Sequence, residues 1–411
     1  MQFTCAAPRW IPWRVSGVLR MSVARQLDSA LFENGPLLGL QRRLGLVEDD
    51  QFNVIYRAAL VILIGWVPLV ILSVGQDLTL HTNSTISLLW DAGAHARYLL
   101  AAPLLVLAEV ECGRRLSAVV RNFINAGLIP DDERKHFDAV VASSRRLLDS
   151  NTAEIVVIAL AYITAAIALF SLPSDQIPVW HRSSGVVPVY SLAGWWHILV
   201  SLPLLLILIL GWMWRLALWT RLLWLVARLN LRLVASHPDH AAGLGFLGIS
   251  VRGFSFVTVA LAVIAAGRSA NIVLLGGTLP TQYFFFNVGL LLTVVALFVA
   301  PLLVFTPKLA DTGRSAAFEY GALAFRVGSA FEDKWLGTDD SAGKAALDRP
   351  DFSATTDLYS ITANIYALRF IPIDLQSLIM LASAMLVPFV PVVFLALPAE
   401  QILAGLKKLL F

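Results

Sequence analysis

The residues best suited to chemistry lie in one short stretch, SHPDHAAGLGFLG, at positions 236–248. His237, Asp239 and His240 offer imidazole and carboxylate groups, which are ordinary ligands of zinc and iron. Three such groups in one loop would suit a metal site, although their spacing matches no strong metal-binding template such as H-E-x-x-H. The sequence therefore leaves the metal, and any other cofactor, unknown.

The same stretch has two other interpretations. Serine or aspartate just before a helix caps its free N–H groups, and proline is well tolerated in the first turn. Ser236 or Asp239 would then cap the next helix, and glycines such as Gly243 would let helices approach closely. Alternatively, the loop docks a partner or a phosphate group. We favour the capping interpretation because it requires the fewest assumptions.

One arginine lies deep inside an apolar run. Arg268 is fourteen residues into the run 254–277, where a charge is costly and usually functional. It either extends outward to the lipid headgroups or faces a cavity that holds an anionic ligand or an ion-pair partner. Asp91 and Asp77 are the candidate partners, and Asn271, one turn later, is expected to face the same way.

Two acidic residues, Glu109 and Glu111, lie near the end of another apolar run. Two residues apart on a helix, they point to nearly opposite sides. Either one of them faces the bundle and relays protons, or both reach water at the headgroups. Arg268, Asn271, Glu109 and Glu111 are our candidates for a ligand or ion pathway.

The composition predicts a membrane protein. Of the 411 residues, 58% are hydrophobic and 14% are charged, whereas soluble chains average about 45–50% and about 25%. The mean hydropathy is +0.73. The chain has no catalytic serine elbow, phosphate-binding glycine loop, haem motif or CxxC pattern, so we assign no catalytic residue and do not favour an enzyme.

Seven apolar runs are long enough to be considered as membrane spans, since a helix needs about 20 residues to cross a bilayer. They are 53–75, 96–112, 153–172, 195–233, 254–277, 284–306 and 375–397. The last contains Pro388 and Pro391 and is either a kinked span or a re-entrant hairpin, followed by an amphipathic tail. The expected fold is an all-α integral membrane bundle of six or seven transmembrane helices with helical cytoplasmic segments.

Basic residues alternate between the segments that connect these runs. The successive segments from the N-terminus carry 6, 0, 7, 1, 5, 0 and 7 Lys and Arg residues. Basic loops stay in the cytoplasm, so we expect a bacterial inner-membrane protein with a cytoplasmic N-terminus. The expected segments are a cytoplasmic 1–52, a six-span core 53–306 with cytoplasmic loops 113–152 and 213–253, a cytoplasmic helical 307–371, and the span or hairpin with its tail at 372–411.

Several fragments together resemble a family of bacterial polytopic inner-membrane proteins with an HPDxxxGLxFL loop. They are RYLLAAPLLVLAE, HPDHAAGLGFL, AFEYGALAFRVGSAFEDKWL and the C-terminal LVPFVPVVFLALPAEQILAGLKKLLF, and the resemblance covers most of residues 50–411. It implies a polytopic membrane fold and carries over no activity or catalytic residue. Family members tend to have two glycines where this chain has Ala242-Gly243, so glycine is not strictly required at position 242.

The sequence favours a channel-like or transporter-like protein. The alternatives are a membrane-embedded metal-dependent enzyme and a scaffold or sensor that acts through its cytoplasmic helices. The expected partners are the lipid bilayer, a second copy of the chain and a cytoplasmic protein. Nucleic acid is not expected, because headgroup contact explains the basic stripe of Arg221, Arg228 and Arg232. The tryptophans near this stripe are expected to be interfacial anchors, namely Trp212, Trp214, Trp219 and Trp224. No convincing internal repeat is evident, which counts against an ordinary secondary transporter.

Overall fold

The computed structural model describes residues 52–80, 84–171, 178–181, 190–276, 284–336 and 351–396. Within these ranges every regular element is a helix and none is a strand, so the all-α fold is confirmed. Residues 1–51 and the expected amphipathic tail at 397–411 lie outside the described residues.

Six helices are long and apolar enough to cross a membrane, by length and composition alone. They are Val54–Leu78, Asn151–Ser171, Leu192–Arg228, Ser255–Leu274, Val288–Trp335 and Leu375–Ala396. A further helical rod, not among these six, consists of α6 (Ala92–His95), η1 (Ala96–Ala101) and α7 (Ala102–Asn125). It contains the second apolar run of the sequence. The chain therefore has the helices of an integral membrane protein.

Most of these rods are built from more than one helical element. The elements are α3 (Phe52–Gly65), α4 (Val67–Leu80), α9 (Asn151–Ser171), α10 (Leu192–Trp196), η4 (His197–Ser201), α11 (Leu202–Arg228), α13 (Ser255–Gly276), α14 (Phe284–Val299), η7 (Ala300–Phe305) and α15 (Thr306–Trp335). Short helices connect them, namely α5 (Ser84–Leu89), η3 (Val179–His181), η5 (Gly245–Leu247) and α12 (Gly248–Gly253).

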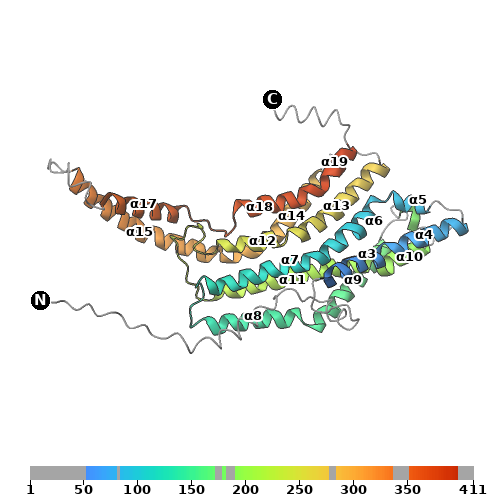
Figure 1. The fold of residues 1–411 in the computed structure, drawn as a ribbon, viewed down its shortest axis with the longest axis horizontal. Coiled ribbons are helices and arrows are strands. Elements are labelled where there is room, and N and C mark those ends of the chain that lie inside the picture. The colour runs from blue at the N-terminus through green and yellow to red at the C-terminus, as the bar shows by residue number, and fades with distance from the viewer. Residues whose placement is uncertain are drawn as a thin grey trace, which may run out of the picture.

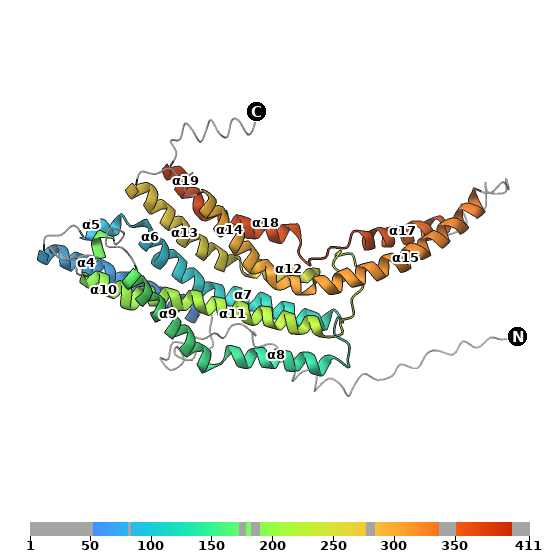
Figure 2. The same ribbon diagram turned by 180° about the vertical axis from the view of Figure 1, so that it is seen from behind.

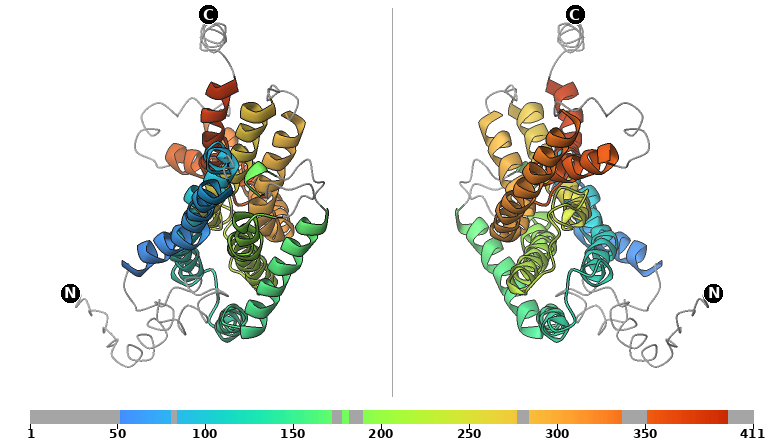
Figure 3. Two further views of the ribbon diagram at one scale, coloured as in Figure 1. Left: turned by 90° about the vertical axis from the view of Figure 1, so that its right-hand side faces the viewer. Right: turned by 90° about the vertical axis from the view of Figure 1, so that its left-hand side faces the viewer.

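The rods form an elongated bundle (Figure 1). Viewed along its length, α7 and α11 occupy the middle (Figure 3). Helix α7 packs against α3 and α13, while α11 packs against α9 and against α8 (Arg134–Leu148). The two central helices are thus covered by neighbours on several sides, which explains why polar groups on them can be fully buried.

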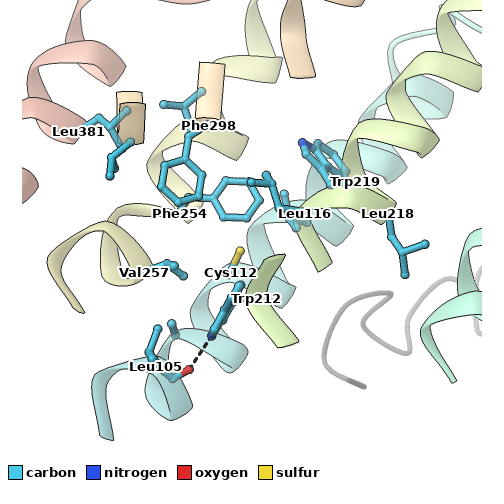
Figure 4. Packing of buried hydrophobic residues seen from close by; sticks show 14 of the residues in the cluster. Leu105, Cys112, Leu116, Trp212, Leu218, Trp219, Phe254, Val257, Phe298 and Leu381 are labelled. Carbon is cyan, nitrogen blue, oxygen red and sulfur yellow. Dashed lines mark hydrogen bonds between the residues drawn. The ribbon is translucent and has the colours of Figure 1, made fainter. Parts of the chain in front are cut away.

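Aromatic and aliphatic side chains fill the interior between these helices. Figure 4 shows the Trp212 indole directed toward Leu105, and its N–H donates a hydrogen bond of 2.9 Å to the Leu105 carbonyl. Trp212 and Trp219 are therefore core residues, with exposed fractions of 3% and 0%, and our interpretation of them as interfacial anchors is wrong. The hydrogen bond to a backbone carbonyl offsets the energetic cost of burying the Trp212 indole N–H.

Two arginines of the expected basic stripe, Arg221 and Arg228, lie on α11, whereas Arg232 lies beyond the end of this helix at Arg228. Arg221 donates a 2.9 Å hydrogen bond to Ser143 of α8, so it joins two helices. Arg228 stacks on the exposed Trp224, with its guanidinium carbon 3.5 Å from the ring centroid. Of these two arginines of α11, Arg228 is the exposed one and is free for headgroup contact.

An arm projects beyond one end of the bundle (Figure 2). Helix α15 continues from η7, and α17 (Asp351–Tyr366) packs back along it. The arm exposes large apolar side chains, including Phe318 and Phe325, with exposed fractions of 80% and 75%. It is a two-helix surface with unpartnered aromatic groups.

The last apolar segment keeps one direction along α13. It consists of α18 (Leu375–Leu386), η8 (Val387–Phe389) and α19 (Val390–Ala396), all of which contact α13. Val392 of α19 clusters with Ala266 and Ala270. This is the geometry of the kinked helix, with the irregular turn at Pro388, and not that of a hairpin.

The structure also reveals a local repeat that the sequence analysis did not find. The rods α6–η1–α7 and α10–η4–α11 begin alike, 100 residues apart. Asp91 and Ser191 cap their N-termini with side-chain oxygens, a π-helical segment follows, and Pro103 and Pro203 stand in the first turn of the long helix. The two rods run in the same direction (Figure 1). The repeat lies in backbone conformation and spacing more than in residue identity.

Candidate functional site

Three charged side chains from three helices meet inside the bundle. Glu109 of α7 accepts hydrogen bonds from the guanidinium groups of Arg57 on α3 and Arg215 on α11, the latter at 2.8 Å. Their exposed fractions are 3% for Glu109, 8% for Arg57 and 4% for Arg215. We call these three residues the buried triad.

The buried triad carries one excess positive charge, because two guanidinium groups share one carboxylate. The Nε atoms of Arg57 and Arg215 are buried and have no hydrogen-bond partner among the described residues. Arg215 gains a further contact from the Trp212 ring, whose centroid is 4.8 Å from its guanidinium carbon. A buried charge without a counterion is costly, so an added anion at this place would lower the energy of the triad.

The two acidic candidates of α7 have different environments. Glu111 forms a pair with Arg115 at 2.6 Å, about one-third exposed, while Glu109 faces the interior. Sequence reasoning missed Arg57 and Arg215, which are the partners of Glu109. The signal was present, since Arg57 is a charge at the start of an apolar run, and Arg215 was counted with a cytoplasmic loop instead of with the membrane helix that contains it.

A second polar layer surrounds Asp91, at the N-terminal end of the same rod. One carboxylate oxygen of Asp91 accepts from the Ala94 N–H at 2.8 Å and from the Asn271 amide at 2.7 Å. The other accepts from the Trp180 indole at 3.0 Å. Asn271 also accepts from the Gly93 N–H at 3.1 Å. These bonds fasten α13 and η3 to the beginning of α6.

Arg268 is separated from this layer. Its side chain is exposed and has no hydrogen-bond or ion-pair partner among the described residues. Asp91 is occupied as described, and Asp77 accepts from the N–H groups of Ser84 and Thr85. Asn271 points inward, so the two residues do not face the same way. Arg268 lies on the exposed side of α13 and Asn271 lies on the side that contacts α6. This geometry matches the interpretation in which Arg268 extends outward.

The loop at 236–248 is organised by one carboxylate. Asp239 accepts backbone hydrogen bonds from Ala241 at 2.9 Å, Gly243 at 3.1 Å and Gly245 at 2.8 Å, and lies 2.9 Å from the His237 ring. Burial would raise the pKa of Asp239, but these hydrogen bonds outweigh burial and hold it below 3.8. The stabilisation is therefore present above about pH 4 and is lost as the pH falls through the lowered pKa.

Asp239 holds a loop and does not cap the helix of the fifth apolar run as expected, because that helix, α13, begins only at Ser255 and the N-cap of η5 is Leu244 without a side-chain hydrogen bond. Both oxygens of Asp239 are engaged with the turn that leads into η5, and His240 has a left-handed backbone with φ 53°. Among the described residues, no group of three or more His, Cys, Asp or Glu side chains is arranged to hold a metal ion. Ala242 also has φ 53°, a backbone conformation that glycine adopts more readily than alanine.

The loop docks a segment of its own chain. The His240 carbonyl accepts from the Arg369 N–H at 2.7 Å, and the Asp239 carbonyl accepts from the Arg369 guanidinium at 2.9 Å. Beyond it, Arg252 of α12 binds Asp374, which caps α18. The loop and α12 thus hold the segment that leads from the arm into the last helix.

We expect Asp239→Ala to loosen this connection, because three backbone N–H groups lose a charged acceptor worth about 1.5–3 kcal/mol per bond. Hydrogen–deuterium exchange should become faster at 236–248 and at 367–374. His237→Gln is the control, since the His237 side chain is 46% exposed and its loss leaves the three backbone bonds to the Asp239 carboxylate intact. Unchanged exchange in Asp239→Ala would show that the carboxylate does not organise the loop.

The bundle therefore contains two buried polar layers that are joined by the central rod. Asp91 and Glu109 are about 27 Å apart along it, at about 1.5 Å per residue. No family model, curated protein or solved structure that was compared with this chain matches it.

Proposed function

We propose that this chain is a channel-like or transporter-like protein of the bacterial inner membrane and that it moves a small anion past the buried triad. The observation that carries this proposal is the excess positive charge of Arg57, Glu109 and Arg215 within apolar helices. Ionisable groups inside a membrane protein are expensive and typically belong to a substrate or ion pathway. An excess of guanidinium over carboxylate favours an anion as the species that passes.

The orientation in this proposal follows from the basic residues. The end of the bundle formed by α8 and α15 includes the exposed Arg146 and Arg314, and basic segments stay in the cytoplasm. The buried triad then lies toward the cytoplasmic side, and the Asp91 layer lies toward the outside. The N-terminus is cytoplasmic in this arrangement. The bacterial inner membrane as the location is part of the same proposal, and the resemblance to a bacterial inner-membrane family supports it.

Anion flux through reconstituted protein tests the proposal. Liposomes of phosphatidylethanolamine and phosphatidylglycerol are loaded with potassium chloride, and chloride efflux is recorded with an ion-selective electrode. We expect chloride efflux above that of empty liposomes. In Arg57→Gln the efflux rate should fall about tenfold or more, because residue 57 no longer donates a charged hydrogen bond to the passing anion, and such a bond is worth about a factor of ten or more. Glu109 and Arg215 remain paired in this variant, so folding is preserved.

Arg115→Gln is the matched control, because it also removes one arginine from a carboxylate partner, but at a position that is about one-third exposed. It should conduct like the wild type. Wild-type liposomes that are no leakier than empty ones would contradict the transport proposal. Equal flux in wild type and Arg57→Gln would exclude the triad as the pathway.

The projecting arm favours a second candidate function, a scaffold or sensor that binds a cytoplasmic protein or a second copy of the chain. Phe318 and Phe325 are exposed on α15, and large exposed apolar patches commonly mark interaction surfaces. Light scattering of the purified protein gives the oligomeric state. A Phe318→Ser, Phe325→Ser variant that dissociates an oligomer would assign this surface to self-association.

A further inference from the structure

Several buried polar groups beside the Asp91 layer have no partner. The Tyr98 hydroxyl, both ring nitrogens of His197, the His181 Nε2 and the Arg97 Nε are buried without a hydrogen-bond partner among the described residues. The exposed fractions are 1% for Tyr98, 5% for His197 and 7% for His181. A buried polar group left unsatisfied costs about 1–3 kcal/mol, so a cluster of them needs an explanation.

These groups converge on one place. The ring of His197 lies 5.7 Å from that of Tyr98 and 4.6 Å from that of His181, between centroids. The Arg97 guanidinium carbon is 5.9 Å from the Tyr98 centroid, and its charge also acts on His181 and His197. We call Arg97, Tyr98, His181 and His197 the outer cluster.

The two repeated π-helical segments position the outer cluster. Arg97 and Tyr98 belong to η1, and His197 begins η4. Arg97 and His197 are equivalent positions of the repeat, since both lie six residues after the capping side chain. π-Helical turns interrupt the regular hydrogen bonding and occur frequently at functional sites. The same backbone feature thus brings polar groups from two rods to one point.

The chemistry of the open groups favours an anion over a cation. The nearby carboxylate of Asp91 is already occupied by Ala94, Asn271 and Trp180. A phenol hydroxyl and a guanidinium N–H can donate, and each neutral imidazole can donate one N–H. Burial and Arg97 lower the pKa of His181 to about 3, so its ring is neutral at physiological pH. The one formal charge among the open groups is that of Arg97.

We propose that the outer cluster binds a compact inorganic anion of halide size, held by the Tyr98 hydroxyl, the imidazole N–H groups of His181 and His197, and the Arg97 guanidinium. Because the rings are in contact, with 4.6 and 5.7 Å between centroids, the ion would be held by the N–H and O–H groups at their edges, which favours a small ion over an organic acid. The role of this site as the outer entrance of an anion pathway rests on the proposed function. Binding itself does not depend on it.

Chloride binding to the full-length protein in detergent tests the site, measured by line broadening of the ³⁵Cl resonance at constant ionic strength with potassium gluconate. The Arg57→Gln background is used so that chloride at the buried triad does not contribute. We expect saturable broadening that Tyr98→Phe weakens about tenfold, because one donor to a charge is lost without a change of shape. Arg97→Gln should abolish it.

Tyr162→Phe is the matched control, because that hydroxyl donates to the Leu199 carbonyl at an exposed place. It should bind chloride like its parent. Absence of saturable broadening, or equal binding in Tyr98→Phe and its parent, would overturn the outer site. Zinc binding that depends on His181 and His197 and displaces chloride would reassign the site to a metal. Chloride binding without flux would contradict the proposed function alone, and flux without binding would contradict the outer site alone.

Discussion

Glu109→Gln should destabilise the protein by about 3–5 kcal/mol, the cost of removing one partner from a buried ionic cluster. The variant leaves Arg57 and Arg215 facing one another without a carboxylate, both more than nine-tenths buried. Unfolding is followed by circular dichroism while sodium dodecyl sulfate is added to protein in a mild detergent. The transition should move to a clearly lower denaturant fraction.

The charge count of the buried triad gives this prediction an internal check. Arg57→Gln should cost less than Glu109→Gln, because a neutral Glu109–Arg215 pair remains. The double variant Glu109→Gln, Arg57→Gln restores the wild-type net charge of the triad and should recover part of the lost stability. Non-additivity of this kind is expected for residues in direct contact.

Glu111→Gln on the same helix is the control. Its pair with Arg115 is about one-third exposed, and exposed pairs contribute about 0–1 kcal/mol. If Glu109→Gln unfolds at the same denaturant fraction as Glu111→Gln, water inside the bundle screens the charges of the buried triad.

Gly267→Ala should destabilise the contact between α13 and the start of the central rod. An added Cβ would lie 2.4 Å from the Ala96 Cβ, 3.2 Å from the Ala92 carbonyl oxygen and 3.3 Å from the Gly93 Cα. Because two of these atoms are backbone, relief requires movement of a whole helix. Overpacking of this type costs about 1–3 kcal/mol. The thermal unfolding temperature in detergent should fall.

Gly289→Ala is the matched control, since a Cβ there meets no atom within 4 Å. Alanine is the better helix former by about 1 kcal/mol, so this variant should be neutral or slightly stabilised. An unfolding temperature of Gly267→Ala equal to that of Gly289→Ala would mean that α13 packs less closely on α6 than the distances indicate.

The sequence by itself determined the helices. Apolar runs of about 20 residues leave the chain few alternatives, because a helix is the structure that pairs all backbone groups within a single segment without water. The same runs located the rods that carry Glu109 and Asn271. These inferences depend on neighbours along the chain, which the sequence displays directly.

Only the tertiary structure decided which side chains meet. Helical geometry places Glu109 and Glu111 on opposite sides, but the packing of α3 and α11 chooses Glu109 for the interior and supplies Arg57 and Arg215. Arg268 and Asn271 are one turn apart, and the contact of α13 with α6 turns only Asn271 inward. The outer cluster depends on two π-helical turns 100 residues apart. Contacts between distant helices are set by packing, and periodicity along one helix contains no information about its neighbour.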